Sequence, residues 1–194
     1  MIKMKQNLWV RPGGTFLFAV AALLFFCPAA DAQRRDFMTE PEIEIVRDAQ
    51  DIDMRIDVLT KMIDRRFAAL KIEAGGWKIP TKESEKWGAE PEGTRLQLLT
   101  DITRLLQKAV DDIDDVAEHD ANAQTQNKTT GKLFPKAVRM LSSSAARYSP
   151  ILQTTLKTAV DDKERGAILD AADVCAQIIE AAAKLPPEIK KGKN

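Results

Sequence analysis

Apolar residues recur every three or four positions along most of this chain, and that spacing restricts it to helices that pack together. One stripe comprises Ile45, Ala49, Ile52, Ile56, Leu59, Ile63, Phe67 and Leu70. A second comprises Leu99, Ile102, Leu106, Ala109, Ile113 and Val116. Residues at this spacing share one face of a helix, and the alternation that marks strands is absent from the sequence. The sequence therefore predicts an all-α protein, an antiparallel bundle of four to six helices with no sheet.

Local signals place the ends of the first helical stretch, residues 39–73. The sequence Thr39-Glu-Pro-Glu42 has the spacing of a capping box, with proline in the first turn, where its missing N–H is harmless. Gly75-Gly76 predicts the C-terminal end, because glycine readily takes the left-handed conformation that closes many helices. Asp51 or Asp53 could cap a second helix, so we expect a break or kink near Asp51.

Prolines and polar residues divide the second half of the chain. Residues 118–132 are polar and predict a loop. A helix is expected to resume at Leu133, with Pro135 in its first turn. Pro150 starts a new helix or kinks this one, since proline lacks an N–H and clashes with the preceding turn. A last helix is expected over about 163–183.

The first 32 residues have the three parts of a secretory signal peptide. Basic residues precede the uncharged run 15–26, and Ala30-Asp-Ala32 supplies the small residues that a signal peptidase reads. The run is shorter than the roughly 20 apolar residues that span a bilayer. We expect cleavage after Ala32 and a secreted or periplasmic protein that does not span a membrane, with an uncleaved anchor as the alternative. The mature part would be one helical domain, 33–185, with a basic disordered tail, 186–194.

The supply of reactive side chains argues against most catalytic and metal chemistry. The chain has one His, His119, and two Cys. Covalent haem attachment and di-iron sites need Cys-x-x-Cys-His or paired Glu-x-x-His motifs, so both are excluded. Ser142-Ser-Ser144 lacks the glycines of a nucleophile elbow. We therefore expect a non-enzymatic protein with no metal or other cofactor, in which Cys175 is a buried, unreactive thiol on an apolar helix face.

Charge is balanced overall but unevenly distributed. The chain has 29 Lys+Arg and 29 Asp+Glu, so it lacks the basic surplus expected of a protein that binds nucleic acid. Six acids lie within 111–120, at the C-terminal end of a predicted helix, where the macrodipole disfavours them. We expect Lys132, Lys136 and Arg139, at the start of the next helix, to compensate these acids. A partner's basic patch or a divalent cation are the alternatives.

Segment 74–93 interrupts the helical pattern and contains the best candidate binding residues. It has four Gly, two Pro and no helical period, so it predicts a loop, and a loop of about 20 residues is usually functional. Trp77 and Trp87 lie in it with Ile79 between them, and Trp is enriched at binding hot spots. We predict that Trp77, Ile79 and Trp87 bind a partner. The alternative is that the loop folds back and the rings cap the end of the bundle.

Residues 38–56 resemble the opening of uncharacterised secreted all-helical proteins of bacteria. The similarity rests on Met38-Thr-Glu-Pro-Glu-Ile-Glu-Ile-Val-Arg-Asp-Ala-Gln-Asp51, followed by Arg55-Ile56. It implies an extracytoplasmic helical protein and carries over no active site.

Three functional hypotheses follow. The first is an exported helical bundle that binds an unidentified protein or envelope component through its loops, in an oligomeric state that the sequence leaves open. The second is a periplasmic small-ligand or lipid carrier with a pocket between helices, walled by Met54, Met62 and Met140. The third is an enzyme of unrecognised type. A deep apolar pocket in the core favours the carrier, a solid core with exposed Trp77 and Trp87 favours the partner, and buried carboxylates with perturbed pKa favour the enzyme.

Overall fold

The computed structural model describes residues 35–119 and 129–186, which form helices joined by turns and loops. No strand occurs in these two ranges. The elements are α2 (Glu40–Asp48), α3 (Ile52–Ala69), the 3-10 turn η1 (Thr81–Glu83), α4 (Ser84–Trp87), α5 (Arg95–His119), α6 (Thr129–Thr158) and α7 (Asp162–Ala183). The predicted all-α class and the helical bundle are therefore confirmed.

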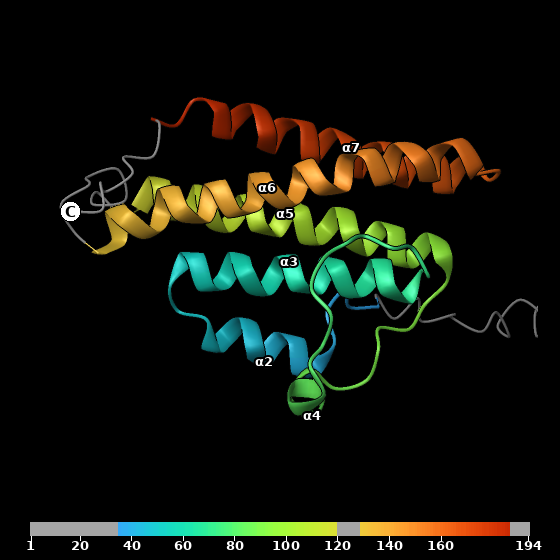
Figure 1. Cartoon of the computed structure of the whole chain (residues 1–194), viewed down its shortest axis with the longest axis horizontal. Helices are drawn as coiled ribbons and strands as arrows, with labels where there is room; N and C mark the ends of the chain where they lie inside the picture. The colour runs from blue at the N-terminus through green and yellow to red at the C-terminus, as the bar shows by residue number, and fades with distance from the viewer. Residues whose placement is uncertain (1–34, 120–128, 187–194) are drawn as a thin grey trace, which may run out of the picture. The chain divides into compact units, whose positions relative to one another are not determined.

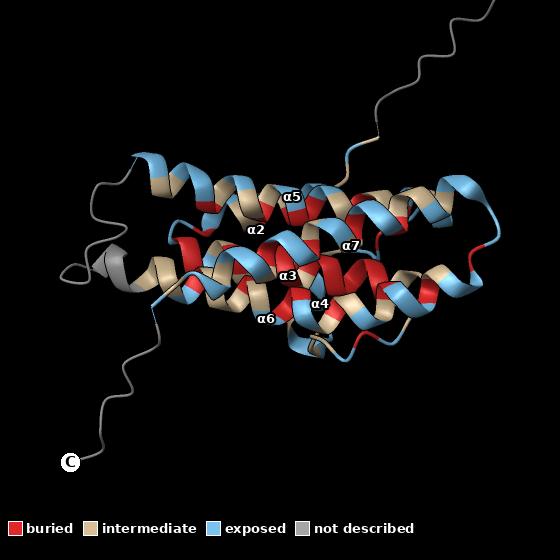
Figure 2. Cartoon of the chain, turned by 90° about the horizontal axis from the view of Figure 1, so that it is seen from above, coloured by how far each residue is buried: buried red, intermediate tan, exposed pale blue. Residues whose placement is uncertain are grey.

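The long helices α3, α5, α6 and α7 pack around a common core, and Figure 1 shows how they are arranged. Helix α3 packs against α5 and α6, and α7 packs against the same two helices. Figure 2 shows the buried residues on the faces that these helices turn toward one another. Burial of this apolar surface is the main stabilising contribution to such a bundle. The side chains with no exposed surface include Ile56, Leu59, Ile63, Ile102, Leu105, Leu106, Ala145, Leu152, Ile168 and Cys175.

The first helical stretch is divided into two helices near Asp51, as expected. Helix α2 ends at Asp48, and α3 begins at Ile52, directly after Asp51, whose backbone is extended. At the start of α2, the Thr39 N–H donates a 2.9 Å hydrogen bond to Glu42 Oε2, which is one of the two contacts of the predicted capping box. The break turns α2 back along α3 (Figure 1). Glu42 is thereby placed within ion-pair distance of α3.

The predicted helix end at Gly75-Gly76 is wrong. Helix α3 ends at Ala69, and Lys71 takes the left-handed conformation with a φ of 59°. The N–H groups of Lys71 and Ile72 each donate a 2.9 Å hydrogen bond to a carbonyl in the last turn of α3. This is the hydrogen-bond pattern of a Schellman motif. Ile72 packs against the core at this turn, so tertiary packing places a lysine where local preference favours glycine.

The polar loop before α6 is shorter than the predicted 118–132. Helix α5 continues to His119 and α6 begins at Thr129, while residues 120–128 lie outside the described part of the chain. Pro135 therefore lies inside α6 rather than in its first turn.

Pro150 also lies inside α6, so it does not start a new helix. Tyr148 and Leu152, on either side of it, have no exposed surface. Their packing holds both halves of α6 in one helix despite the hydrogen bond that proline cannot make. The helix expected over about 163–183 is α7, which starts one residue earlier, at Asp162.

The predicted signal peptide, 1–32, lies outside the described residues, and so does the predicted basic tail, 186–194, except for Pro186. Within 35–119 and 129–186, no helix combines the length and the apolar character needed to cross a membrane.

Candidate functional site

The 74–93 loop carries two short elements where only irregular backbone was expected. The turn η1 and helix α4 form in its middle, and α4 packs against α2. Gly88 ends α4 with a φ of 64°. A Cβ atom at Gly88 would lie 2.8 Å from Pro41 Cγ. Glycine is therefore needed there both for the backbone conformation and for close approach to α2.

The two tryptophans of the loop pack against each other, with ring centroids 4.7 Å apart and an angle of 49° between the ring planes. Trp87 is buried, with 3% of its surface exposed, and the guanidinium of Arg65 lies 5.5 Å from its ring centroid. Trp77 is half-buried, and Lys61 Nζ lies 5.5 Å from its ring centroid. The structure thus brings the two predicted residues together. The loop folds back onto the helices at Trp87, as the alternative expected, so of the two rings only Trp77 stays partly accessible.

A cavity of about 540 Å³ opens between the 74–93 loop and the end of α3. We call it the Trp77 pocket. Its apolar walls come from Ala68, Ile72, Trp77 and Ile79. Two of the three residues predicted to bind a partner, Trp77 and Ile79, therefore line one pocket. The third, Trp87, supports the Trp77 ring.

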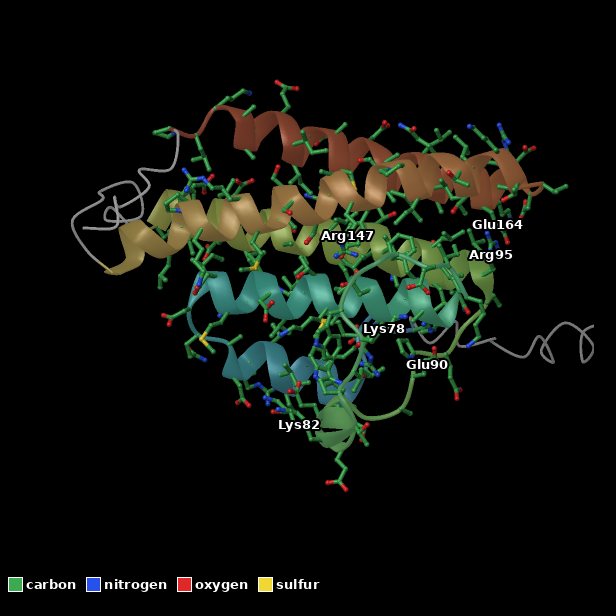
Figure 3. All side chains as sticks on the ribbon, in the orientation of Figure 1. Lys78, Lys82, Glu90, Arg95, Arg147 and Glu164 are labelled. Carbon is green, nitrogen blue, oxygen red and sulfur yellow. The ribbon has the colours of Figure 1, made fainter. Side chains whose placement is uncertain are left out.

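The other side chains that line the pocket are charged. Lys78 Nζ lies 3.2 Å from Glu73 Oε1, and Lys71 Nζ lies 3.9 Å from Glu90 Oε1. All four of these side chains are more than half exposed. Figure 3 labels Lys78 and Glu90 on the loop. Arg65 is the remaining charged lining residue. The pocket thus has apolar walls and a rim with charges of both signs.

A buried carboxylate on α3 fixes the start of the loop. Asp64 accepts hydrogen bonds from the Trp77 N–H over 2.8 Å, the Tyr148 hydroxyl over 3.0 Å and the Arg147 guanidinium over 2.8 Å. Arg147, which Figure 3 labels on α6, also donates to the Ala74 carbonyl over 2.9 Å. Burial opposes the charge of Arg147 more than any single contact favours it, but the hydrogen bonds and charges of Asp64 and Tyr148 together outweigh burial and raise the pKa of Arg147. Burial, and then the charge of Asp64, raise the pKa of Tyr148 well above its ordinary value.

A second buried charge cluster joins α2 to α3 and to the end of the loop. Glu42 has no exposed surface and accepts from Arg65 Nη1 over 2.6 Å and from Arg66 Nη2 over 2.7 Å. Arg65 also donates to the Ala89 carbonyl. Burial alone would raise the pKa of Glu42, but the hydrogen bond and charge of Arg66, the Thr39 N–H and the charge of Arg65 hold it below its ordinary value. A general acid or base works best with a pKa near the operating pH, so this carboxylate suits a structural ion pair.

The apolar periodicity of the sequence does not identify the charged residues that position the loop. All residues from Met62 to Phe67 are buried, so α3 is covered on every side there, whereas a single apolar stripe predicts only one buried face. The run Asp64-Arg-Arg66 between two core residues was the available signal. Its partners Glu42 and Arg147 lie 23 and 83 positions away from the residues they bind, and no local pattern identifies them.

Lys132, Lys136 and Arg139 were expected to pair with the acids of 111–120, and for Lys136 and Arg139 this expectation is wrong. Lys136 Nζ binds Asp53 over 2.5 Å, and Arg139 donates to the Pro186 carbonyl over 2.6 Å. Asp53 is nearly buried and needs a counter-charge more than solvated acids do. The side chain of Lys132 lies outside the described part.

Partners for the acidic run come instead from α5 itself. They are the pairs Lys108–Asp112 and His119–Asp115, and the hydrogen bond from Gln107 to Asp111. Within the described ranges, no group of three or more His, Cys, Asp or Glu side chains is placed to hold a metal ion.

Cys175 is buried, as expected for a thiol on an apolar helix face. Burial raises its pKa to about 12. Its thiolate is therefore scarce at neutral pH, and the thiolate is the reactive form of the side chain.

Comparison of the chain with protein-family models, with curated proteins and with solved structures found no match.

Proposed function

We propose that this chain is an exported, non-enzymatic binding module that recognises a protein or envelope partner at the Trp77 pocket. The pocket itself is the observation that carries the proposal. A half-buried Trp77 lies beside Ile79 in a concave apolar wall with a charged rim. Binding hot spots combine the same features, an aromatic anchor in a desolvated centre and a polar surround.

The chemistry of the pocket favours an apolar side chain on a protein segment. Its walls can remove such a side chain from water, which stabilises a complex by about 25 cal/mol per Å² of apolar surface buried. The exposed rim has two lysines, Lys71 and Lys78, and two glutamates, Glu73 and Glu90. A ligand of one charge sign would meet like charges there. A segment with an apolar residue between charges of both signs would meet complementary ones.

A small-ligand or lipid carrier is the second candidate, and it would need a pocket between the helices. A hollow of about 210 Å³ lies between α5, α6 and α7, with Val110, Ile113, Leu141 and Ile178 among its lining residues. Pockets for small ligands usually measure about 300–1,000 Å³. The Trp77 pocket falls within that range and this hollow does not. We therefore place binding at the Trp77 pocket.

The export part of the proposal is supported by the sequence of residues 1–32 and by the resemblance of residues 38–56 to secreted bacterial proteins. It is tested by expressing the full chain in a Gram-negative bacterium and measuring the intact mass in each cell fraction. We expect a periplasmic or secreted protein that begins at Gln33. An Ala32→Arg variant should remain uncleaved. Full-length wild-type protein in the membrane fraction would instead support the anchor alternative.

The binding part is tested with a displayed library of random peptides, selected on the immobilised protein. We expect enriched peptides to share one apolar position, and Ile79→Asp to weaken their binding at least about tenfold because it puts a charge in an apolar wall. Leu169→Asp is the matched control, since Leu169 is 47% exposed on α7. No enrichment, or equal binding to the Ile79→Asp variant, would show that the Trp77 pocket is not the binding site.

A further inference from the structure

The two ends of the 74–93 loop are attached to the helices by different contacts. Residues 74–77 are attached by hydrogen bonds, because the Trp77 N–H donates to Asp64 and the Ala74 carbonyl accepts from Arg147. The far end is attached by burial of Trp87, which is 3% exposed, and by a hydrogen bond from Arg65 to the Ala89 carbonyl. Between these ends, most side chains of residues 81–86 are exposed. Both ends of the loop are therefore held against the helices, while the segment between them is exposed.

Adjacent glycines at the start of the loop lie in contrasting surroundings. Gly75 has a φ of 61°, and a Cβ atom there would meet nothing within 4 Å. A Cβ atom at Gly76 would lie 2.2 Å from Asp64 Oδ2 and 2.3 Å from Arg147 Nη1. Gly75 thus turns the chain in open space, and Gly76 allows the backbone to lie directly on the ion pair.

The ion pair beneath Gly76 would remain paired if the loop lifted. Asp64 would keep its hydrogen bonds from Arg147 and from the Tyr148 hydroxyl, which also lies 3.1 Å from the Thr60 carbonyl. Release of residues 75–80 would therefore break the hydrogen bond from the Trp77 N–H to Asp64 and leave no buried charge uncompensated, while buried Ala74, before Gly75, keeps its hydrogen bond from Arg147. Release of Trp87 would expose a buried ring. The start of the loop is thus the end that opens more readily.

We propose that residues 75–80 are a flap over the Trp77 pocket, hinged at Gly75, held closed by the hydrogen bond from the Trp77 N–H to Asp64, and attached to the helices on either side by Arg147 at Ala74 and by buried Trp87. Opening carries Trp77 and Ile79 away from α3 and uncovers the face of the Trp87 ring that Trp77 packs against. The pocket then becomes wider and more apolar. The importance of the flap for binding rests on the function proposed above, whereas its opening is a property of the free protein.

The proposal is tested by amide hydrogen exchange on the full chain without any partner, because exchange reports local opening. Gly76→Ala is expected to speed exchange at the Trp77 amide at least about tenfold, since the added methyl cannot share space with the ion pair. Asp64→Asn, which keeps the shape of the acceptor and removes its charge, should change the same amide in the same direction. Gly166→Ala on α7 is the matched control, because a Cβ atom there meets nothing within 4 Å, and it should leave the Trp77 amide unchanged.

Two results would contradict the proposal that residues 75–80 open as a flap. One is a Trp77 amide that stays as protected in both loop variants as in the wild type. The other is an equal loss of protection in α5 and α7, which would show general destabilisation instead of local opening. Neither result depends on the peptide experiment. Failure to select a peptide would contradict the proposed function, but it would not change the hydrogen exchange expected at the Trp77 amide.

Discussion

The carboxylate of Asp64 on α3 and the hydroxyl of Tyr148 on α6 meet at 3.0 Å in the buried interior of the bundle. The Tyr148 ring also packs on Phe67, with centroids 5.2 Å apart. Because Asp64 also accepts a hydrogen bond from the Trp77 N–H, one carboxylate joins the helix core to the 74–93 loop. The position of the candidate pocket therefore depends on how α3 and α6 pack.

Tyr148 should not ionise while the protein is folded. It is the only tyrosine in the chain, so the ultraviolet absorbance of tyrosinate reports on it alone. Burial and the charge of Asp64 raise its folded pKa above the unfolded value. The stability that this shift contributes is complete below about pH 10 and decreases as the pH rises further. We expect tyrosinate to appear together with unfolding, monitored by circular dichroism, and a smooth titration of the folded protein near pH 10 would contradict this.

Glu42 should link stability to acid pH. Its folded pKa lies below the unfolded one because the hydrogen bonds and charges of Arg66 and Arg65 outweigh the effect of burial. The stabilisation is therefore present above the ordinary pKa of 4.5 and is lost as the pH falls through the folded value. Glu42→Gln should cost about 3–5 kcal/mol at pH 7, because it removes the carboxylate to which both buried guanidinium groups are hydrogen-bonded. Arg66 then keeps only the buried Asp101 carboxylate, which lies 4.0 Å from its Nε. Urea unfolding measures both effects.

A neighbouring glutamate provides the control for this prediction. Glu44 forms an exposed ion pair with Arg47, and exposed pairs contribute about 0–1 kcal/mol. Glu44→Gln should therefore change the free energy of unfolding by less than about 1 kcal/mol and leave its acid dependence unchanged. Equal effects of the two substitutions would show that the buried ion pairs of Glu42 contribute no more to stability than the exposed pair of Glu44.

The two tryptophans should differ in their contribution to stability. Trp87→Ala is expected to lower the free energy of unfolding by about 3–5 kcal/mol, as is usual for the loss of a large buried aromatic ring. Trp77→Ala, at a half-buried position, should cost only about 1–2 kcal/mol. Guanidinium unfolding followed by circular dichroism compares the two variants. A larger loss from Trp77→Ala would mean that Trp77, and not Trp87, anchors the loop.

Lys71 should be replaceable by glycine with a gain in stability. A non-glycine residue in the left-handed conformation costs about 1–2 kcal/mol, and glycine loses about 0.5–1 kcal/mol more entropy on folding. Lys71→Gly should therefore stabilise the protein by up to about 1 kcal/mol in urea unfolding. Lys71→Ala also removes the contact with Glu90 but keeps a Cβ atom, so it should give no such gain. Destabilisation by both variants would show that the lysine side chain itself holds the turn.

Much of the helical framework could be predicted from the chain because its causes lie within a few residues of their effects. The capping box at Thr39, the cap at Asp51 and the apolar stripes each act within one or two helical turns. Trp77 and Ile79 were also identified as candidate binding residues, since unpaired apolar side chains in a long loop suggest a contact surface. Their role in binding stays a prediction.

Tertiary structure decided the features that join distant residues. It buried Trp87 against Arg65, placed Lys71 in a conformation that glycine usually fills, and kept Pro150 inside one continuous helix. It also gave Asp64 its partners from α6 and from the loop. Each of these depends on which helix faces turn toward each other, and a periodic stripe does not specify that. The spacing of apolar residues is enough to make this chain form amphipathic helices, whereas the location of the pocket and the contacts that hold it depend on how those helices pack.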